Sequence, residues 1–303
     1  PITTFAREAK KIMIDIDPNE LGKFKKFNLD FDLLIQDDLN NFFDIFNSNS
    51  QIDLQNNFYL DKHKLWIEKI RTWRELFSSK SLKINQDLEY IDPYSFFDEL
   101  SKKIKKNSLI FIDTGCSIAW AMQVMRFGEG QKVFHDFNNT AMGWALPASI
   151  GAYFAQNDKE LVCIVGDGSF MMSLQELATV MHHKIKIKLI IINNSGYSMI
   201  KQTQEQWLNS NYVASSKSGG ISFPSFKKIS STFNLDYFFI QDLQNDKNKF
   251  DCFLKNEKAS LLEVMISEDA RVVPQVKFGR PNEDMEPLLP RDIFYKNMII
   301  KPI

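Results

Sequence analysis

Leu161-Val-Cys-Ile-Val-Gly-Asp-Gly-Ser169 runs from an apolar segment into a polar loop, and Lys188-Leu-Ile-Ile-Ile-Asn-Asn-Ser-Gly196 repeats that arrangement further along the chain. Each apolar segment has the length and the residue types of a buried strand. The carboxyl ends of neighbouring parallel strands lie at one edge of a sheet, where open α/β sheets bind their ligands. We therefore expect Asp167 and Asn194 to lie side by side at such an edge.

Apolar runs of this kind alternate with helical patterns over most of the chain. The strand-like runs cover residues 109–113, 132–137, 161–165, 188–192, 237–240 and 261–266. The helical patterns cover residues 93–106, 117–125, 142–154, 173–183, 199–207, 226–233 and 242–254. This alternation predicts an α/β fold, a doubly wound and mostly parallel sheet with helices on both faces.

The first 90 residues differ from the regular pattern that follows them. A strand at 11–17 and a helix near 37–46 predict that residues 1–47 are the end of an α/β domain whose main part is absent. Residues 48–90 are polar apart from an amphipathic helix near 64–77, so we interpret them as a helical connector. Residues 91–303 form the third predicted region, and we expect the chain to be a C-terminal piece of a longer protein.

Composition and charge exclude several classes of protein. The 37 basic and 38 acidic side chains leave a net charge of −1, which gives no basic surface for nucleic acid. No apolar run approaches the roughly 18 residues that cross a bilayer. Three widely spaced cysteines, Cys116, Cys163 and Cys252, fit neither a disulfide framework nor a zinc site. We expect a cytoplasmic protein that binds neither membranes nor nucleic acid.

The two polar loops contain the chemistry of a hard-cation site. The carboxylate of Asp167, the amide oxygen of Asn194 and a carbonyl near Gly196 would form an all-oxygen ligand set, which suits Mg²⁺ together with substrate phosphates. Taken singly, Gly-Asp-Gly is more typical of a tight turn than of a metal site, and Asn-Asn is more typical of a helix cap. The two loops together, each after an apolar strand, favour the metal site.

The same residues resemble a known family. Gly166-Asp167-Gly168, twenty-four further residues and Asn193-Asn194 match the thiamine diphosphate (ThDP) signature of the acetolactate synthase-like enzymes. Met142-Gly-Trp-Ala-Leu-Pro-Ala-Ser-Ile-Gly151 is also similar to that family, and residues 11–20 resemble the last strand and turn of its central domain. The resemblance covers essentially the whole chain and implies the ThDP-binding fold.

The resemblance implies roles for individual residues. Asp167 and Asn194 would bind Mg²⁺ through side-chain oxygens, and Gly196 would bind it through its carbonyl. Met142 would support the bend of the cofactor, and the Thr140 carbonyl would accept a hydrogen bond from its aminopyrimidine. The remaining residues expected around the cofactor are Gly115, Cys116, Ser117, Gly166, Gly168, Ser169, Phe170, Tyr197, Ser198 and Met199.

The resemblance also implies the reaction and the partners. ThDP accepts the electrons released when a 2-keto acid, here pyruvate, loses CO₂, and the product is joined to an acceptor. In the family a glutamate on a separate N-terminal domain, usually of a partner subunit, activates the cofactor. We assign that role to no glutamate of this chain, so we expect the chain alone to be inactive and to act in a homo-oligomer with the missing half.

Several stretches depart from the family pattern and leave alternatives open. Cys116-Ser-Ile118 replaces the usual Gln-His-Gln, and Ser198 replaces a common glycine. These changes suggest an unusual acceptor such as a keto sugar, with His135, Lys277 and Arg280 as candidate substrate contacts. His135 is equally typical of a structural loop histidine, and the two cations of solvated surface charge.

Three other functions also fit the sequence. They are a ThDP-dependent decarboxylase, a flavin-linked oxidase and a non-catalytic cofactor-binding module. Binding of FAD is left undecided, because most of the central domain that would hold it is missing.

Overall fold

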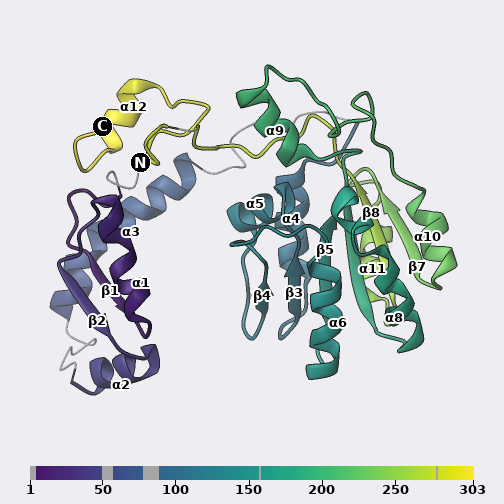
Figure 1. Ribbon diagram of the computed structural model, residues 1–303, viewed down its shortest axis with the longest axis horizontal. Helices are drawn as coiled ribbons and strands as arrows, with labels where there is room; N and C mark the ends of the chain where they lie inside the picture. Colours follow the sequence, from purple (N-terminus) through teal and green to yellow (C-terminus); the bar gives the residue numbers. More distant parts are fainter. Residues whose placement is uncertain (1–4, 50–56, 78–88, 157, 278) are drawn as a thin grey trace. The chain divides into compact units, whose positions relative to one another are not determined.

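The computed structural model describes residues 5–49, 57–77, 89–156, 158–277 and 279–303. The chain forms two compact units: unit 1 comprises Pro1–Ser78 and Val273–Ile303, and unit 2 comprises Ser79–Val272 (Figure 1). None of the helices in the described ranges combines the length and the apolar character needed to span a bilayer.

Unit 2 is an α/β domain built on one parallel sheet. Its strands are β3 (Leu109–Ile112), β4 (Lys132–Phe134), β5 (Leu161–Gly166), β6 (Ile187–Asn193), β7 (Asp236–Ile240) and β8 (Ser260–Met265). Its helices are α4 (Pro93–Lys103), α5 (Cys116–Val124), α6 (Ala145–Ala155), α7 (Asp167–Met171), the 3₁₀ helix η4 (Leu174–Glu176), α8 (Leu177–His182), α9 (Ser198–Trp207), α10 (Phe226–Thr232) and α11 (Lys247–Lys255).

The strand order of this sheet is β4-β3-β5-β6-β8-β7, and every neighbouring pair is parallel. In sequence, β3 and β4 precede the central strands β5 and β6, whereas β7 and β8 follow them. The chain therefore winds outward from the middle of the sheet in two directions. This confirms the predicted doubly wound α/β fold.

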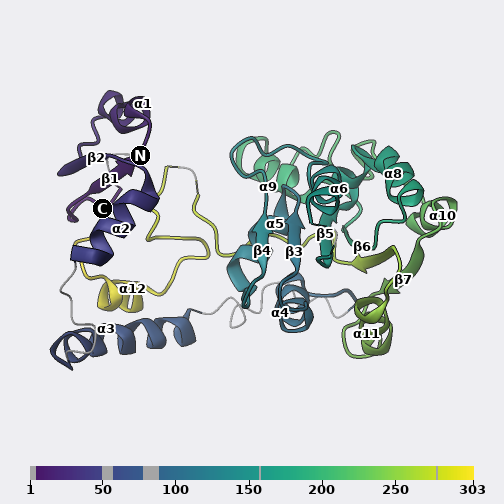
Figure 2. The same cartoon turned by 90° about the horizontal axis from the view of Figure 1, so that it is seen from below.

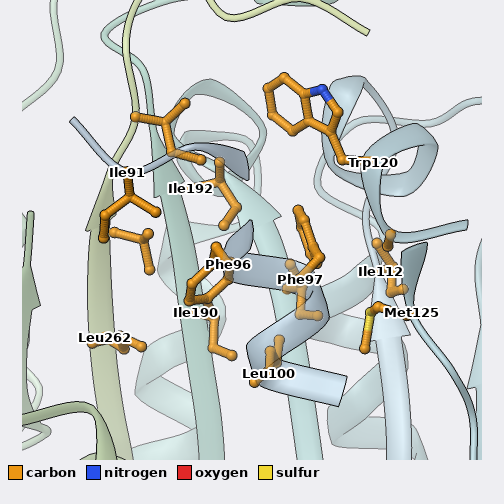
Figure 3. Close-up of a cluster of buried hydrophobic side chains, with 14 of the residues drawn as sticks. Ile91, Phe96, Phe97, Leu100, Ile112, Trp120, Met125, Ile190, Ile192 and Leu262 are labelled. Carbon is orange, nitrogen blue, oxygen red and sulfur yellow. The ribbon is translucent and has the colours of Figure 1, made fainter. Parts of the chain in front are cut away.

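Alternate residues of the central strands enter two separate hydrophobic clusters. Val162 and Ile164 of β5 pack with side chains of α4, α5 and α11, whereas Leu161, Cys163 and Val165 pack with those of α6, α8 and α10. Figure 2 shows α4 and α11 on one side of the sheet and α6 and α8 on the other. A close view of the first cluster shows aromatic rings of α4 beside the aliphatic side chains of the strands (Figure 3). Strands buried on both faces read as continuous apolar runs, which explains the pattern in the sequence.

Unit 1 contains a two-stranded parallel sheet and several helices. Its elements are β1 (Ile12–Asp15), α1 (Pro18–Gly22), the 3₁₀ helix η2 (Lys23–Phe27), β2 (Leu33–Gln36), α2 (Leu39–Asn49), α3 (Asn57–Leu76) and α12 (Arg291–Asn297). Ile12 to Asp15 pair in register with Leu33 to Gln36. The strand β2 and the helix α12 have no counterpart among the sequence-based predictions.

The predicted regions, 1–47, 48–90 and 91–303, differ from the compact units in two respects. The predicted connector is divided, because its residues up to Ser78 group with residues 1–47 in unit 1. The segment after Val272, which the sequence analysis assigned to the last region, groups with unit 1. Its helix α12 is joined to α3 by a hydrogen bond from Trp73 Nε1 to Asn297 Oδ1 at 2.7 Å. Residues 50–56 and 78–88 of the predicted connector lie outside the described residues, and the boundaries themselves stay predictions.

Candidate functional site

The ends of β5 and β6 lie side by side, as the two apolar runs predicted. Gly166, the last residue of β5, is paired with Ile192 in the ladder between the two strands. Asp167 therefore begins α7 at the same edge of the sheet at which Asn194 follows β6. The two candidate metal ligands are directly connected, because the Asn194 amide N–H donates to Asp167 Oδ2 at 3.1 Å.

The carboxylate of Asp167 is almost completely buried, with 2% of the residue exposed. It also accepts hydrogen bonds from the amides of Gly168, at 2.7 Å, and Gly196, at 3.2 Å. Burial raises the pKa of Asp167 to about 7, although these amide hydrogen bonds act in the opposite direction. The charged form thus lacks a compensating cation, which a bound metal would provide.

Asn194 presents an acceptor that the described residues leave unused. Its Nδ2 donates to Ser198 Oγ at 2.7 Å, and this contact fixes the orientation of the amide. Its Oδ1 is buried and has no hydrogen-bond partner within the described ranges. A buried acceptor without a protein partner normally binds a water molecule or an ion, so Asn194 fits the predicted Mg²⁺ ligand set.

Within the described residues, no cluster of three or more His, Cys, Asp or Glu side chains could hold a metal. The predicted Mg²⁺ ligand set is of a different kind, because it contains one carboxylate, one amide oxygen and one backbone carbonyl.

Two glycines allow this edge of the sheet to close around the site. A Cβ on Gly168 would lie 2.0 Å from the ring of Tyr197, and a Cβ on Gly196 would lie 2.6 Å from the carbonyl oxygen of Ser215. Any larger residue would displace these neighbours. The glycines of both loops are thus required by close approach of the chain to itself.

A pocket of about 500 Å³ opens over these loops. Its walls include predicted cofactor residues from four separate segments: Gly115, Cys116, Ser117, Thr140, Met142, Gly166, Asp167, Gly168, Ser169, Asn194, Gly196, Tyr197, Ser198 and Met199. Phe170 is not among the lining residues, because its ring is buried in the core against Phe226. The volume is within the range of small-molecule and cofactor sites.

Cys116 in this pocket is a neutral structural thiol. Burial raises its pKa to about 12, and its Sγ lies 3.6 Å from Gln202 Oε1. A thiol in this state is a poor nucleophile. Cys116 stands in the stretch that replaces the Gln-His-Gln of the family it resembles. This replacement therefore changes the shape and polarity of the pocket and adds no thiolate.

Asp113, at the end of β3, is a site residue that the sequence analysis missed. Its buried carboxylate accepts from the amides of Gly143, at 3.0 Å, and Ala145, at 2.7 Å. These bonds hold the segment that directly follows Met142. Helix α6 begins at Ala145, whereas the pattern predicted a helix from residue 142. Gly143 has a φ of +80°, outside the helical region, which explains the later start.

Helix α9 is held against the end of unit 2 by contacts that sequence spacing could not indicate. Its first turn lines the pocket, and Arg271 binds Glu205 further along it through Nε and Nη2, at 2.9 and 2.6 Å. Gln202 Oε1 accepts from the Val272 amide at 3.0 Å. These residues position the α9 wall of the pocket.

The three predicted substrate contacts do not line this pocket. His135 follows β4 directly, and its ring contacts that of Phe137, which does line the pocket. Lys277 and Arg280 belong to unit 1, where they pair with Glu286 and Asp284 at 3.6 and 4.0 Å. Their role in substrate binding stays a prediction.

The chain matches a known protein family over the segment that contains this pocket. The family described as "Thiamine pyrophosphate enzyme, C-terminal TPP binding domain" matches residues 113–264, about half of the chain. The match begins at Asp113 and includes both strand ends and their loops. It agrees with the resemblance read from the sequence.

Curated relatives with similar sequences are acetolactate synthases. The large subunit of the *Cyanidium caldarium* enzyme is 27% identical over 285 residues, which cover 93% of this chain and 46% of the relative. That of *Porphyra purpurea* is 29% identical, covering 93% and 45%, and the isozyme 2 large subunit of *Escherichia coli* (strain K12) is 27% identical, covering 94% and 48%. The chain thus spans less than half the length of these relatives.

A solved structure shares the fold. The *Rhodococcus jostii* RHA1 thiamine diphosphate-dependent 4-hydroxybenzoylformate decarboxylase superposes with a TM-score of 0.53 at 19% identity. The superposition covers 60% of this chain and 33% of that one. At this identity the likeness establishes the fold and leaves the reaction open.

Proposed function

The chain belongs to the thiamine pyrophosphate enzymes, in the family of their C-terminal TPP binding domain, and we propose that it forms the metal- and diphosphate-binding part of a 2-keto acid carboligase of the acetolactate synthase type. The observation that carries this proposal is the unpartnered Oδ1 of Asn194 beside the buried carboxylate of Asp167. Two such oxygens at adjacent strand ends suit a divalent cation, and a cation there suits a diphosphate.

In this proposal Asp167, Asn194 and the Gly196 carbonyl hold Mg²⁺. The loop of residues 115–117 and the opening of α7 would hold the diphosphate, because backbone N–H groups at a helix start have no helical partner. When bound, ThDP supplies an electron-accepting thiazolium for the loss of CO₂ from a 2-keto acid.

The chain's own residues prepare the pocket for this chemistry. Ile118, Met142 and Ile200 provide apolar walls that exclude water, which strengthens electrostatic interactions within the pocket. Met142 supports the bend of the cofactor, and Asp113 holds the Met142 segment in place through two backbone amides. Asp113 is thus a positioning residue.

The activating glutamate comes from residues outside this chain, on an N-terminal domain that a partner subunit supplies in a homo-oligomer. In support, Asp167 is the sole carboxylate among the pocket-lining residues within the described ranges. The 303-residue chain alone is accordingly inactive. Pyruvate is the proposed donor, and the altered loop at 116–118 suggests an unusual acceptor such as a keto sugar.

Calorimetric titration with ThDP tests the cofactor assignment. We expect binding in Mg²⁺, loss of binding in EDTA, and loss of Mg²⁺-dependent binding in Asp167→Ala. Asp236→Ala serves as the matched control, because Asp236 is an exposed carboxylate at the opposite end of a strand. Unchanged affinity in Asp167→Ala would refute the metal assignment.

Product analysis tests the reaction. The full-length protein is incubated with pyruvate, with and without an aldehyde or keto sugar acceptor. We expect a coupled product containing a two-carbon unit from pyruvate. Free acetaldehyde alone would identify a decarboxylase, and acetate formation with reduced flavin would identify an oxidase; either would replace the carboligase proposal.

A further inference from the structure

A second polar hollow lies at the edge of the sheet opposite the pocket. It has a volume of about 440 Å³. We call it the lysine hollow, after the six lysines in its lining: Lys105, Lys159, Lys184, Lys186, Lys188 and Lys258. Three carboxylates, Asp158, Glu160 and Glu257, together with Tyr153 and Asn256, complete the lining.

The topology of the sheet brings these lysines together. Lys105 precedes β3, Lys159 precedes β5, Lys184 and Lys186 precede β6, and Lys258 precedes β8. These four strands are consecutive neighbours in the sheet. Their amino ends therefore bring cations from four separate segments to one place, whereas the ThDP pocket lies beyond their carboxyl ends.

The hollow carries a local excess of positive charge. Six lysines against three carboxylates give a net formal charge of +3, in a chain whose total is −1. Four helices, α4, α6, α8 and α11, end before these four strands, and each places at most about half a negative charge at this edge. Their sum is smaller than the lysine excess, so the helix ends do not balance it.

Only two of the six lysines of the hollow form ion pairs with its carboxylates within the described ranges. We call the other four the rim lysines. Glu160 accepts from Lys105 at 3.2 Å and lies 3.7 Å from Lys188. The ammonium groups of the other four lysines have no carboxylate within 4.0 Å among the described residues. These four are Lys159, Lys184, Lys186 and Lys258, and all but the half-buried Lys159 are exposed.

Lys188 forms the fixed inner wall of the hollow. It is 4% exposed, and its Nζ donates to the carbonyl of Asn256 at 2.7 Å, at the end of α11. Burial lowers its pKa, but Glu160 acts to raise it. A buried cation held by carbonyls cannot turn outward to meet solvent anions, so the four rim lysines are the ones available to a ligand.

We propose that the lysine hollow is a second anion site that binds a phosphate ester or polyphosphate with at least two phosphate groups. Four ammonium groups that no carboxylate pairs with in the described ranges surround this polar hollow. They match a ligand of charge −2 or more, because lysine acts as a flexible point charge toward phosphate. A single phosphate would engage only part of the rim. The site is independent of the function proposed for the ThDP pocket.

Site-resolved lysine acetylation of the full-length protein tests this proposal. The experiment is carried out in EDTA with Asp167→Ala, so that the metal-dependent diphosphate site does not contribute. Inorganic pyrophosphate, ADP and phosphate are the three probes. At a probe concentration of about ten times Kd, acetylation of Lys184 and Lys186 should slow roughly tenfold, as mass action requires, while that of the exposed Lys227 and Lys228 on α10 should not change.

Matched variants complete the test. Lys184→Gln/Lys186→Gln should weaken pyrophosphate binding by at least about tenfold, because two charge-assisted contacts are removed. Lys227→Gln/Lys228→Gln, which makes the same change in net charge, should leave the affinity unaltered. Protection by ADP and not by pyrophosphate would identify a nucleotide site, and protection by both would identify a diphosphate site. Protection by neither, or equal protection of the α10 lysines, would overturn the proposal.

Discussion

At the scale of single residues, Asp167 combines two opposing properties. It is the carboxylate proposed above to bind a metal, yet burial raises its pKa from the ordinary 3.8 to about 7 in the chain without metal. The folded state therefore holds a proton on Asp167 at pH values where the unfolded state has lost it. Stability contributed by this group is fully present below the unfolded pKa and is lost as the pH rises through about 7.

The change Asp167→Asn should remove this pH dependence. In EDTA, the free energy of unfolding of the wild type relative to the variant should fall by about 2 kcal/mol between pH 5 and pH 8, as expected for a buried acid that ionises in this range. Urea unfolding of both proteins at several pH values measures the difference. Parallel pH curves for the two proteins would show that Asp167 is already ionised at pH 5.

Gly196 offers a second test at this scale, because a side chain at this position would clash with a backbone atom, which cannot move aside easily. A Cβ there would meet the Ser215 carbonyl at 2.6 Å, so Gly196→Ala should cost about 1–3 kcal/mol of stability and lower ThDP affinity. Gly151, inside α6, has open space around its Cβ position, and Gly151→Ala should stabilise the protein by about 0.5–1 kcal/mol. Thermal unfolding compares the two, and equal effects would contradict the close approach.

The candidate site residues that could be predicted are those marked by their immediate sequence neighbours. Asp167 and Asn194 each follow an apolar strand directly, so the sequence places them at a sheet edge. Asp113 also ends an apolar run, but its role depends on amides 30 and 32 positions away. No spacing rule indicates such a contact, and the same holds for Arg271 and Glu205, which are 66 positions apart.

At the scale of elements, the connection from β3 to α6 determines where Met142 lies. The carboxylate of Asp113 binds the amides of Gly143 and Ala145, directly after Met142, and so holds this segment at the end of β3. The first turn of α6 thereby obtains an acceptor that its own N-cap residue, Trp144, does not provide. The loop and the helix start thus depend on one buried side chain.

Asp113→Asn tests this dependence. An amide side chain can accept through only one of its two end atoms, so one buried N–H would lose its partner, at a cost of about 1–3 kcal/mol. We expect a lower melting temperature and weaker ThDP binding in Mg²⁺. Asp136→Asn, in the loop between β4 and α6, is the control and should change stability by no more than about 0.5 kcal/mol. If the two variants behaved alike, Asp113 would have no special role in positioning the loop.

The boundaries of strands could be predicted well where a strand is buried on both faces of the sheet, and less well elsewhere. The central strands are buried on both faces and their apolar runs coincide with β5 and β6 to within a residue or two. Strand β2 in unit 1 has half-exposed or exposed residues at all four positions, and its apolar run, Leu33-Leu34-Ile35, is shorter than those of the central strands. The predicted helix at 173–183 is divided into η4 and α8, because the chain passes through a 3₁₀ turn at Leu174–Glu176.

At the scale of the whole molecule, unit 2 has polar sites at both edges of its sheet and an apolar strip on α9. Several apolar residues on and after this helix are exposed: Met199 (39%), Ile200 (41%), Leu208 (56%) and Val213 (61%). Met199 and Ile200 also line the ThDP pocket. A second copy of the chain that covered this strip would bury apolar surface and close the pocket at once.

The variant Leu208→Lys tests the homo-oligomer proposed above. A charge in a buried apolar contact is strongly unfavourable, so sedimentation velocity on the full-length protein should show a shift toward smaller species at equal concentration. Phe154→Lys is the matched control, because Phe154 is 60% exposed on α6 and does not belong to the strip. An equal shift in both variants, or a wild type that stays monomeric at all concentrations, would exclude α9 as the contact. Because association and pocket closure involve the same helix, the Leu208→Lys protein should also bind ThDP more weakly, whereas the control should keep its affinity.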